Sequence, residues 1–475
     1  MKDGNAPAAA NRSIPNVPQR LSLWDTVSII VGIVVGTAIF RSPPLVFQNT
    51  TGPWEALGAW LLGGAWCLCG AFCYAELATT FPRNGGDYEY LRQAFGGWLG
   101  FLFGWAQLVA VLTGSIGAMG YAFADYGAQL WPRSSFSTAV VAAAAIAVLT
   151  AANAFGIVFG KKVQNVLTLA KIAGLALVVV AGLLGRGAPL LTTAAIGELQ
   201  GPGFGLALVF VLYAYGGWND AVFVAAEVRD QRRNMPRALF YGIGLITLLY
   251  LAVNAAYLKS LGFEGVRQSS TPAASVVENV VGHWGGRAIS ALVMISALGA
   301  INGLLLAGSR IYAVMGEDFR LFSWLRTGGT QAGAPVAAIV LQGGVSIVLV
   351  FGVGTAAGRD GVDHLLRALG LADVPWEAYF GGFEALVAGT APVFWAFFLL
   401  TGVSVFVLRV KHPQQRPFSI PLYPLPAVVF CLTCAYMFYC SLEYAKSLVL
   451  LAVVPVALGL PLYLLCQVWT QRRSS

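Results

Sequence analysis

Two apolar segments of this sequence are interrupted near their centres by glycines. The first interruption is Gly32-Ile33-Val34-Val35-Gly36-Thr37-Ala38. Glycine adopts backbone angles that other residues avoid, so glycines four positions apart, followed by Thr37, predict an unwound turn. Unwinding frees main-chain N–H and C=O groups, which need partners inside a membrane. Taken alone, the pattern fits a bound polar ligand and a close helix-packing contact equally well.

The second interruption, Tyr213-Ala214-Tyr215-Gly216-Gly217-Trp218-Asn219-Asp220, places adjacent glycines in another apolar segment. Paired interruptions at corresponding places in two halves indicate the binding site of an inverted-repeat transporter. An α-amino acid would satisfy the freed groups, because its carboxylate suits a half-helix N-terminus and its ammonium suits free carbonyls.

Ionisable residues within or beside the apolar segments are rare and therefore informative. Lys171 lies several residues inside the fifth segment. It could donate hydrogen bonds to the freed carbonyls or carry a coupled proton, and the alternative is a lysine that snorkels to the surface. Asp220, beside the second interruption, would either receive a cationic side chain or face a wet vestibule. Glu76 and Glu227 lie near helix ends with Arg83 and Arg229 close in sequence, so we expect structural or gating ion pairs there.

Catalytic, metal and cofactor chemistry find no support in the sequence. A phosphate-binding glycine loop with Lys-Ser/Thr and a Ser, His and carboxylate cluster are both missing. The seven cysteines lie within or beside apolar runs, and the three histidines are scattered. We therefore expect neither an enzyme, nor a metal site, nor a cofactor.

The composition is that of an all-α integral membrane protein, with 57% hydrophobic and 11% charged residues against about 25% charged residues in soluble domains. The net charge of +8 comes mainly from short segments between apolar runs, which favours lipid headgroups as partners over nucleic acid. About twelve segments are long enough to span a bilayer, approximately at 23–48, 54–80, 97–128, 136–157, 163–185, 203–226, 237–260, 286–314, 335–353, 388–409, 421–440 and 445–469.

The distribution of basic residues predicts that both termini are cytosolic, because most Lys and Arg then lie on the inside. Residues 1–20 and 471–475 are expected to be cytosolic tails. Within the segments, Gly114, Gly117 and Gly120 predict close helix packing. In the long loop 354–389, the amphipathic stretch Val362 to Leu371 fits an interfacial helix better than a lid.

Several ordered motifs resemble the amino acid–polyamine–organocation superfamily, and more closely the prokaryotic members of its L-type amino-acid transporter branch. The resemblance extends from Leu21 to about Tyr439. It rests on the stretches Cys73 to Tyr90, Tyr213 to Asn219, Glu227 to Ala238, Ile301 to Arg310, and Leu408 to Pro421.

The resemblance implies a LeuT-like core of five plus five inverted helices at 21–410, with helices 1 and 6 broken, and two accessory helices at 411–470. It implies alternating access and exchange in the cytoplasmic membrane. It assigns the substrate carboxylate to Gly36, Thr37 and Ala38, and the ammonium to the main chain of Val34, Tyr213, Ala214 and Gly216. It makes Tyr213 an aromatic gate and Asn219 an orienting residue. It also places Ser115, Met119 and Trp395 in the side-chain pocket, and Ser296 opposite the helix-five lysine, Lys171.

Four departures from the family pattern bear on function. Thr37 and Ala38 replace Ser and Gly of the usual Gly-Ser-Gly, Tyr213 replaces Phe, and Arg41 directly follows the first broken helix. Animal relatives bind a glycoprotein through a Cys in the loop after helix three, but Leu130 to Ser137 contains no Cys, so no disulfide-linked partner is expected. We expect a transporter of neutral α-amino acids. The alternatives are a cationic amino-acid or polyamine transporter using Asp220, and a channel or sensor derivative.

Overall fold

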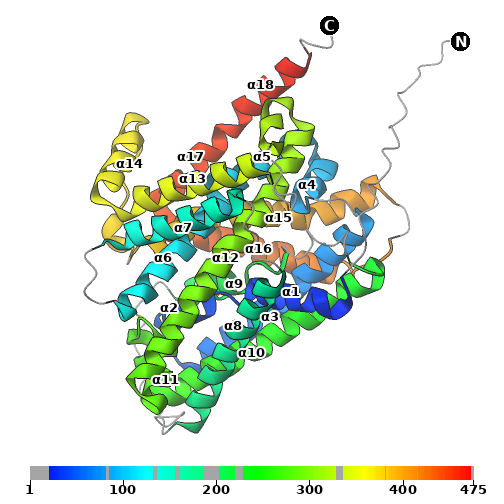
Figure 1. Ribbon diagram of the computed structural model, residues 1–475. Helices are drawn as coiled ribbons and strands as arrows, with labels where there is room; N and C mark the ends of the chain where they lie inside the picture. The colour runs from blue at the N-terminus through cyan, green and yellow to red at the C-terminus, as the bar shows by residue number, and fades with distance from the viewer. Residues whose placement is uncertain are drawn as a thin grey trace, which may run out of the picture.

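The computed structural model describes residues 21–81, 85–131, 136–155, 161–185, 203–219, 228–327, 335–379, 381–413 and 416–471. Within these ranges the secondary structure is helical, apart from an isolated parallel bridge between Leu21 and Val228. The helices pack against one another in a single bundle, with α14 at its edge (Figure 1).

The described helices fall into two groups, before residue 185 and after residue 203. The first group is α1 (Leu23–Val34), α2 (Ala38–Gln48), α3 (Pro53–Thr80), α4 (Asp87–Phe95), α5 (Gly97–Ala106), the π-helical turn η1 (Gln107–Val111), α6 (Leu112–Leu130), α7 (Thr138–Ala154) and α8 (Lys161–Leu184). The second group is α9 (Phe204–Tyr215), α10 (Gln231–Gln268), α11 (Pro272–Val281), α12 (His283–Asp318), η3 (Arg320–Arg326), α13 (Val336–Gly354), α14 (Ala356–Ala368), η4 (Trp376–Ala378), α15 (Gly382–Lys411), α16 (Leu425–Ala445), η5 (Lys446–Val449), α17 (Leu450–Ala457) and α18 (Gly459–Gln471).

Seven helices of the described chain are long and apolar enough to cross a membrane, or eight when α1 and α2 count as one bent span. Three shorter apolar helices accompany them, at Thr138–Ala154, Leu169–Leu184 and Phe204–Tyr215. The last two predicted spans, 421–440 and 445–469, fall in one apolar stretch, Leu425–Val468. The structure therefore shows an all-helical membrane protein with a broken first helix.

The first helix begins and ends for local reasons. Ser22 and Asp25 form a capping box, in which the Asp25 N–H donates to Ser22 Oγ over 3.2 Å and the Ser22 N–H donates to Asp25 Oδ2 over 3.0 Å. The helix then continues through Gly32 and stops at Val34, and α2 leaves at a bend of 54°. The predicted break is confirmed, and it lies at the Gly36 end of the interruption.

The third span is continuous from Gly97 to Leu130, but it contains the π-helical turn η1. Such turns often mark functional positions in helices. Beyond it the span packs closely on its neighbours, as its glycines predict. A Cβ added to Gly114 would lie 2.6 Å from Thr390 Cγ2, and one added to Gly117 would lie 2.6 Å from Leu386 Cδ1. One added to Gly120 would lie 3.1 Å from Ile146 Cδ1, so the predicted close packing is confirmed.

The amphipathic stretch after α13 is helical, as predicted. It forms α14, in which Leu366 is buried while most other side chains are exposed or half-exposed. The returning chain is fixed by Asp363, whose carboxylate accepts hydrogen bonds from the Val374 N–H (3.0 Å) and Trp376 Nε1–H (2.9 Å). These contacts hold the returning chain against α14.

Candidate functional site

The first break is a tight, fully buried turn. The carbonyl of Val34, the last residue of α1, accepts a hydrogen bond from the Gly36 N–H over 2.7 Å. Thr37 precedes α2, and its Oγ1 is buried without a hydrogen-bond partner in the described part of the chain. Ala38 opens α2 and is 7% exposed. Buried hydroxyls are normally paired, so Thr37 Oγ1 is a polar group available to a ligand or water.

The second break begins where α9 ends at Tyr215. Gly216 takes an extended conformation and its N–H donates to the Tyr213 carbonyl over 3.0 Å. Gly217 has φ of 99°, a conformation that favours glycine. Asn219 is buried. Asp220 lies outside the described residues, together with the segment that would form the other half of this helix.

Tyr250 of α10 joins the two breaks. Its hydroxyl lies 2.9 Å from the Val34 carbonyl and 2.9 Å from the Ala214 carbonyl. The hydroxyl has one proton, so it donates to one carbonyl at a time while touching both. Tyr250 was missed in the sequence reasoning. The sequence feature that could have indicated it is a tyrosine in the middle of an apolar span, because a buried tyrosine hydroxyl needs a hydrogen-bond partner.

A small, partly open cavity brings together three of the predicted site residues. Gly216, Asn219 and Trp395 line it, and its volume of about 20 Å³ has room for one water molecule. The remaining lining residues are Trp66, Cys67, Leu212, Trp218, Phe394, Phe398, Phe430, Thr433 and Cys434. None of these side chains from the described residues carries a charge, so the cavity suits an uncharged group.

Lys171 and Ser296 lie on facing helices. The C-terminal end of α8 packs on α11, which leads directly into α12, so α8 and α12 run antiparallel. Gly174 fits against Leu292, where an added Cβ would be 2.2 Å from Cδ2. Lys171 lies about one turn before Gly174, and Ser296 lies about one turn after Leu292. Because the two helices are antiparallel, both residues lie on the same side of the Gly174–Leu292 contact. Both are buried, and the Ser296 hydroxyl has no partner among the described residues.

The three remaining predicted residues occupy α6 and α9. The hydroxyl of Ser115 donates to the Val111 carbonyl of the π-helical turn over 2.9 Å. Met119 is buried one turn later. The half-buried ring of Tyr213 packs edge-on against Phe383 of α15, with ring centroids 5.9 Å apart. The structure gives no direct contact that assigns Ser115 or Met119 to the cavity.

The expected ion pair at Glu76 exists, but with partners distant in sequence. Its carboxylate accepts a hydrogen bond from Arg409 Nε (2.7 Å), lies 3.1 Å from Arg416 Nε, and accepts another from the Ile420 N–H (2.9 Å). Arg83 and Glu227 lie outside the described residues. The Glu76 side chain is 4% exposed, so this cluster, the Glu76 cluster, is a buried connection between α3 and the end of α15.

A second buried carboxylate, Asp87, begins α4 near the same end of α3. It accepts hydrogen bonds from the hydroxyls of Tyr74 and Thr401, the latter over 2.9 Å. The helix α4 is not among the candidate spans. Burial raises the pKa of Asp87 to about 6, against the opposing effect of the two hydroxyls.

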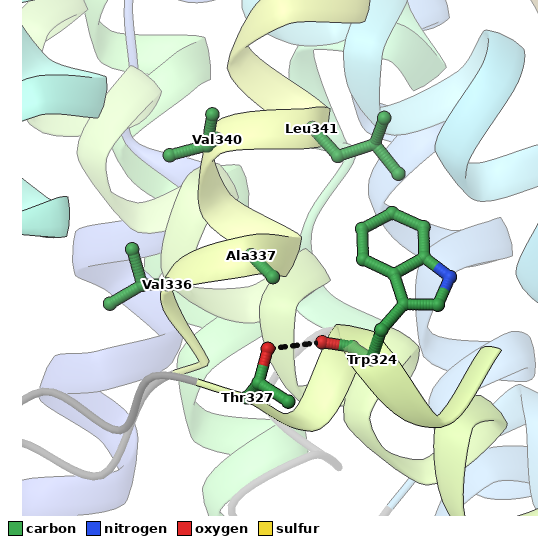
Figure 2. Close-up of a pocket in the computed structure, with 6 residues that line it drawn as sticks. All are labelled: Trp324, Thr327, Val336, Ala337, Val340 and Leu341. Atoms are coloured by element: carbon green, nitrogen blue, oxygen red, sulfur yellow. Dashed lines mark hydrogen bonds between the residues drawn. The ribbon is translucent and has the colours of Figure 1, made fainter.

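A wider hollow lies away from both breaks, between η3 and α13. Figure 2 shows Trp324 and Thr327 on one side, with Val336, Ala337, Val340 and Leu341 on the other. The hollow is open and its volume is about 460 Å³. The Thr327 hydroxyl already donates to the Trp324 carbonyl over 2.6 Å, so few polar groups remain for a ligand. We assign the polar chemistry of this protein to the breaks.

The fold and the first break define a class: a multi-pass helical membrane protein whose first span is bent and interrupted. Comparison with protein families assigns the chain to one of them. The amino acid permease family matches residues 21–461, so the chain belongs to that family. It is therefore an amino-acid transporter of the amino acid–polyamine–organocation superfamily, and not an enzyme.

Curated relatives of the L-type branch align over most of the chain. The mouse (Mus musculus) b(0,+)-type amino acid transporter 1 is 27% identical over 87% of this chain and 81% of its own length. The human (Homo sapiens) cystine/glutamate transporter is 25% identical over 99% and 90%. The human large neutral amino acids transporter small subunit 2 is 28% identical over 96% and 81%.

Proposed function

We propose that this protein exchanges neutral α-amino acids across the cytoplasmic membrane by alternating access. The observation that carries the proposal is the Tyr250 hydroxyl, which lies 2.9 Å from a carbonyl of each broken helix. A group shared by two breaks couples their positions, which alternating access at one central site requires. The uncharged lining of the adjacent cavity supports a neutral substrate side chain.

The architecture proposed is a five-plus-five inverted-repeat core at 21–410 with two accessory helices at 411–470. The bent pair α1–α2 and the interrupted α9 support broken helices at the first and sixth positions. The three shorter apolar helices, and the turn at Lys446 with φ of 47° inside the last apolar stretch, support a total of about twelve spans. Both termini would then be cytosolic, as the basic residues predict.

In this proposal the main-chain groups of the breaks bind the backbone of the amino acid. Gly36, Thr37 and Ala38 would bind its carboxylate, because the N-terminus of α2 presents N–H groups and a positive dipole end. The carbonyls at Val34, Tyr213 and Gly216 would receive its ammonium. The Val34 carbonyl already contacts Gly36 and Tyr250, so the ammonium would share or replace the Tyr250 contact.

The side chain of the substrate would enter the space between α6, the second break and α15. Asn219 and Trp395 line the small cavity beside the second break, whose other walls come from α3, α9, α15 and α16. Ser115 and Met119 of α6 are proposed to complete the pocket, with Tyr213 covering it. Cystine, glutamate and large neutral amino acids appear in the names of relatives, so the relatives alone leave the side-chain class undecided.

Purified protein in proteoliposomes tests the proposal. Uptake of labelled leucine or alanine should require an unlabelled neutral amino acid inside and should be competed by others outside. Uptake into empty-lumen vesicles driven by a pH gradient would indicate proton symport instead. Failure of every neutral amino acid to be taken up would contradict the proposal. Uptake of arginine or spermidine that is lost in Asp220→Asn would favour a cationic substrate.

Lys171 is proposed to act in coupling, since its ammonium is buried on the α8 face that meets Ser296. The variant Lys171→Ala should slow exchange or shift its pH dependence. Lys259 is only half-buried, and its ammonium is hydrogen-bonded to the Leu183 carbonyl, so it offers a control lysine whose replacement should do neither. Unchanged kinetics of Lys171→Ala across pH would remove Lys171 from the mechanism.

A further inference from the structure

Four side chains from four helices form a continuous row beside the first break. Arg41 Nη2 of α2 lies 2.8 Å from Asp125 Oδ2 of α6. Arg41 Cζ also lies 5.7 Å from the ring centroid of Phe383, which in turn packs edge-on against Tyr213 at 5.9 Å and 90°. We call Asp125, Arg41, Phe383 and Tyr213 the gate row. It connects the two broken helices with α6 and α15.

The main chain reinforces the row at the neighbouring residue. Pro44 has no N–H, so the carbonyl of Phe40, four residues earlier in α2, loses its helical donor. The hydroxyl of Tyr126 fills that position and donates to the Phe40 carbonyl over 3.1 Å. Two adjacent residues of α2, Phe40 and Arg41, are therefore fastened to two adjacent residues of α6, Tyr126 and Asp125.

The ion pair between Arg41 and Asp125 is only partly buried, so the two charges can separate. The side chains of Arg41 and Asp125 are 24% and 27% exposed. A fully buried pair would be hard to separate, because each charge would be left without water. A fully exposed pair would hold nothing together. Arg41 is therefore only partly covered by protein, and its guanidinium can exchange one carboxylate for another.

An α-amino acid brings a carboxylate to this boundary. Guanidinium groups bind carboxylates in a planar, two-bond geometry, and the carboxylate of Asp125 uses that capacity in the present state. When α2 separates from α6, Arg41 leaves Asp125 and Phe383 together. Its guanidinium is then free to bind the carboxylate of the amino acid that enters past Tyr213.

We propose that Arg41 is a positioning residue of a gate. In the closed state it binds Asp125 and holds Phe383 against Tyr213, and in the open state it binds the carboxylate of the entering amino acid. The inference rests on the proposed function, in which Tyr213 covers the substrate. Arg41 is a departure from the family pattern, so this gate would distinguish the chain from its relatives.

A cysteine reporter tests the closed state without transport. Ser115→Cys is nearly isosteric and lies on α6 about ten residues from Asp125. A membrane-impermeant maleimide is applied to sealed vesicles from the side that carries Arg41. The unsubstituted chain, with its seven cysteines, gives the background, and slowing by excess leucine verifies that the reporter senses the site.

The labelling of Ser115→Cys should accelerate about 3- to 30-fold when Arg41→Gln or Asp125→Asn is added, because an ion pair and a cation–π contact shift such equilibria by this order. The reversed pair, Arg41→Asp with Asp125→Arg, should return the rate toward that of the reporter alone. Unchanged labelling in both single variants, each shown to be folded by gel filtration, would overturn the proposal.

Exchange kinetics test the open state. Arg41→Gln should raise KM for the amino acid about 3- to 10-fold, because the capturing guanidinium is lost. Asp125→Asn should lower KM, because the competing carboxylate is lost while Arg41 remains. A merely structural pair would move KM in the same direction in both variants, and that result would overturn the transfer of Arg41 to the substrate. Lack of exchange by the unsubstituted protein would instead contradict the proposed function, while the labelling result would stand.

Discussion

Two regions of the bundle, the α3–α15 connection at Glu76 and the α2–α6 contact at Arg41, carry ion pairs of opposite design. The Glu76 cluster is buried, with the Glu76 side chain 4% exposed and two arginines plus a main-chain N–H around one carboxylate. The gate row has one arginine and one carboxylate, both about a quarter exposed. The first is surrounded by donors, and the second is only partly covered by protein.

This difference in burial predicts that the Glu76 cluster is a fixed connection and that the Arg41–Asp125 pair is a movable one. Removing a partner from a buried ionic cluster leaves an uncompensated charge, which is strongly destabilising. Removing a partner from a half-exposed pair changes stability little, because water replaces it. We infer that the α3–α15 end is held together throughout the transport cycle, and that the α2–α6 contact is the one that opens.

The largest effect is expected for Glu76→Gln. It leaves Arg409 and Arg416 without their carboxylate, so the free energy of unfolding should fall by about 3–5 kcal/mol. Thermal unfolding in detergent measures the change as a lower Tm. The control Glu443→Gln, on an exposed position of α16, should leave Tm nearly unchanged. Equal Tm values for the two variants would remove the proposed fixed connection.

The next effect concerns pH and Asp87, which lies beside the Glu76 cluster. Burial raises the pKa of Asp87 from an ordinary 3.8 to about 6. Between pH 4 and 6 the folded protein thus holds a proton that the unfolded chain has lost. Its stabilising contribution is complete below pH 4 and is lost as pH rises through 6, by roughly 2–3 kcal/mol.

The variant Asp87→Asn keeps an oxygen acceptor for Tyr74 and Thr401 but does not titrate. Its unfolding free energy should therefore fall less between pH 4 and 6 than that of the unsubstituted protein. Urea titrations at several pH values measure the slope. Asp360→Asn, at an exposed position of α14, should retain the original slope. A slope unaffected by Asp87→Asn would mean that Asp87 does not titrate in this range.

A smaller effect is expected where the two breaks meet. Tyr250→Phe removes the donor shared by the Val34 and Ala214 carbonyls, so the unfolding free energy should fall by about 1–2 kcal/mol and exchange should slow. Tyr257→Phe is the matched control, since the Tyr257 hydroxyl on the same helix has no partner in the described part of the chain. If both variants slow exchange equally, the shared contact at the breaks does not explain the effect.

The smallest change in stability is expected for Asp125→Asn in the gate row. Its partly exposed pair should contribute less than about 1 kcal/mol to the free energy of unfolding, and added salt should reduce even that. The Tm of Asp125→Asn in low and high salt is compared with the Tm of Glu76→Gln, which measures the contrast between the gate row and the Glu76 cluster. A loss as large as that of Glu76→Gln would show that the α2–α6 contact is as fixed as the α3–α15 end.

Much of the fold followed from local features of the chain. Apolar length predicted spanning helices, of which the described chain shows seven or eight, and glycine spacing located the break in the first helix. Gly114, Gly117 and Gly120 predicted the close packing of α6. The amphipathic pattern predicted α14. Ordered motifs then indicated the family, which the match over residues 21–461 confirmed. These features depend on near neighbours in sequence, so the sequence determined them by itself.

The tertiary structure decided which polar groups meet. Tyr250 lies 216 residues from Val34, and Arg409 lies 333 residues from Glu76, so no local pattern pairs them. The same holds for Arg41, which the sequence marked as unusual but left without a partner. In a membrane each buried polar group must find another, and only the packing of distant helices determines which one it reaches.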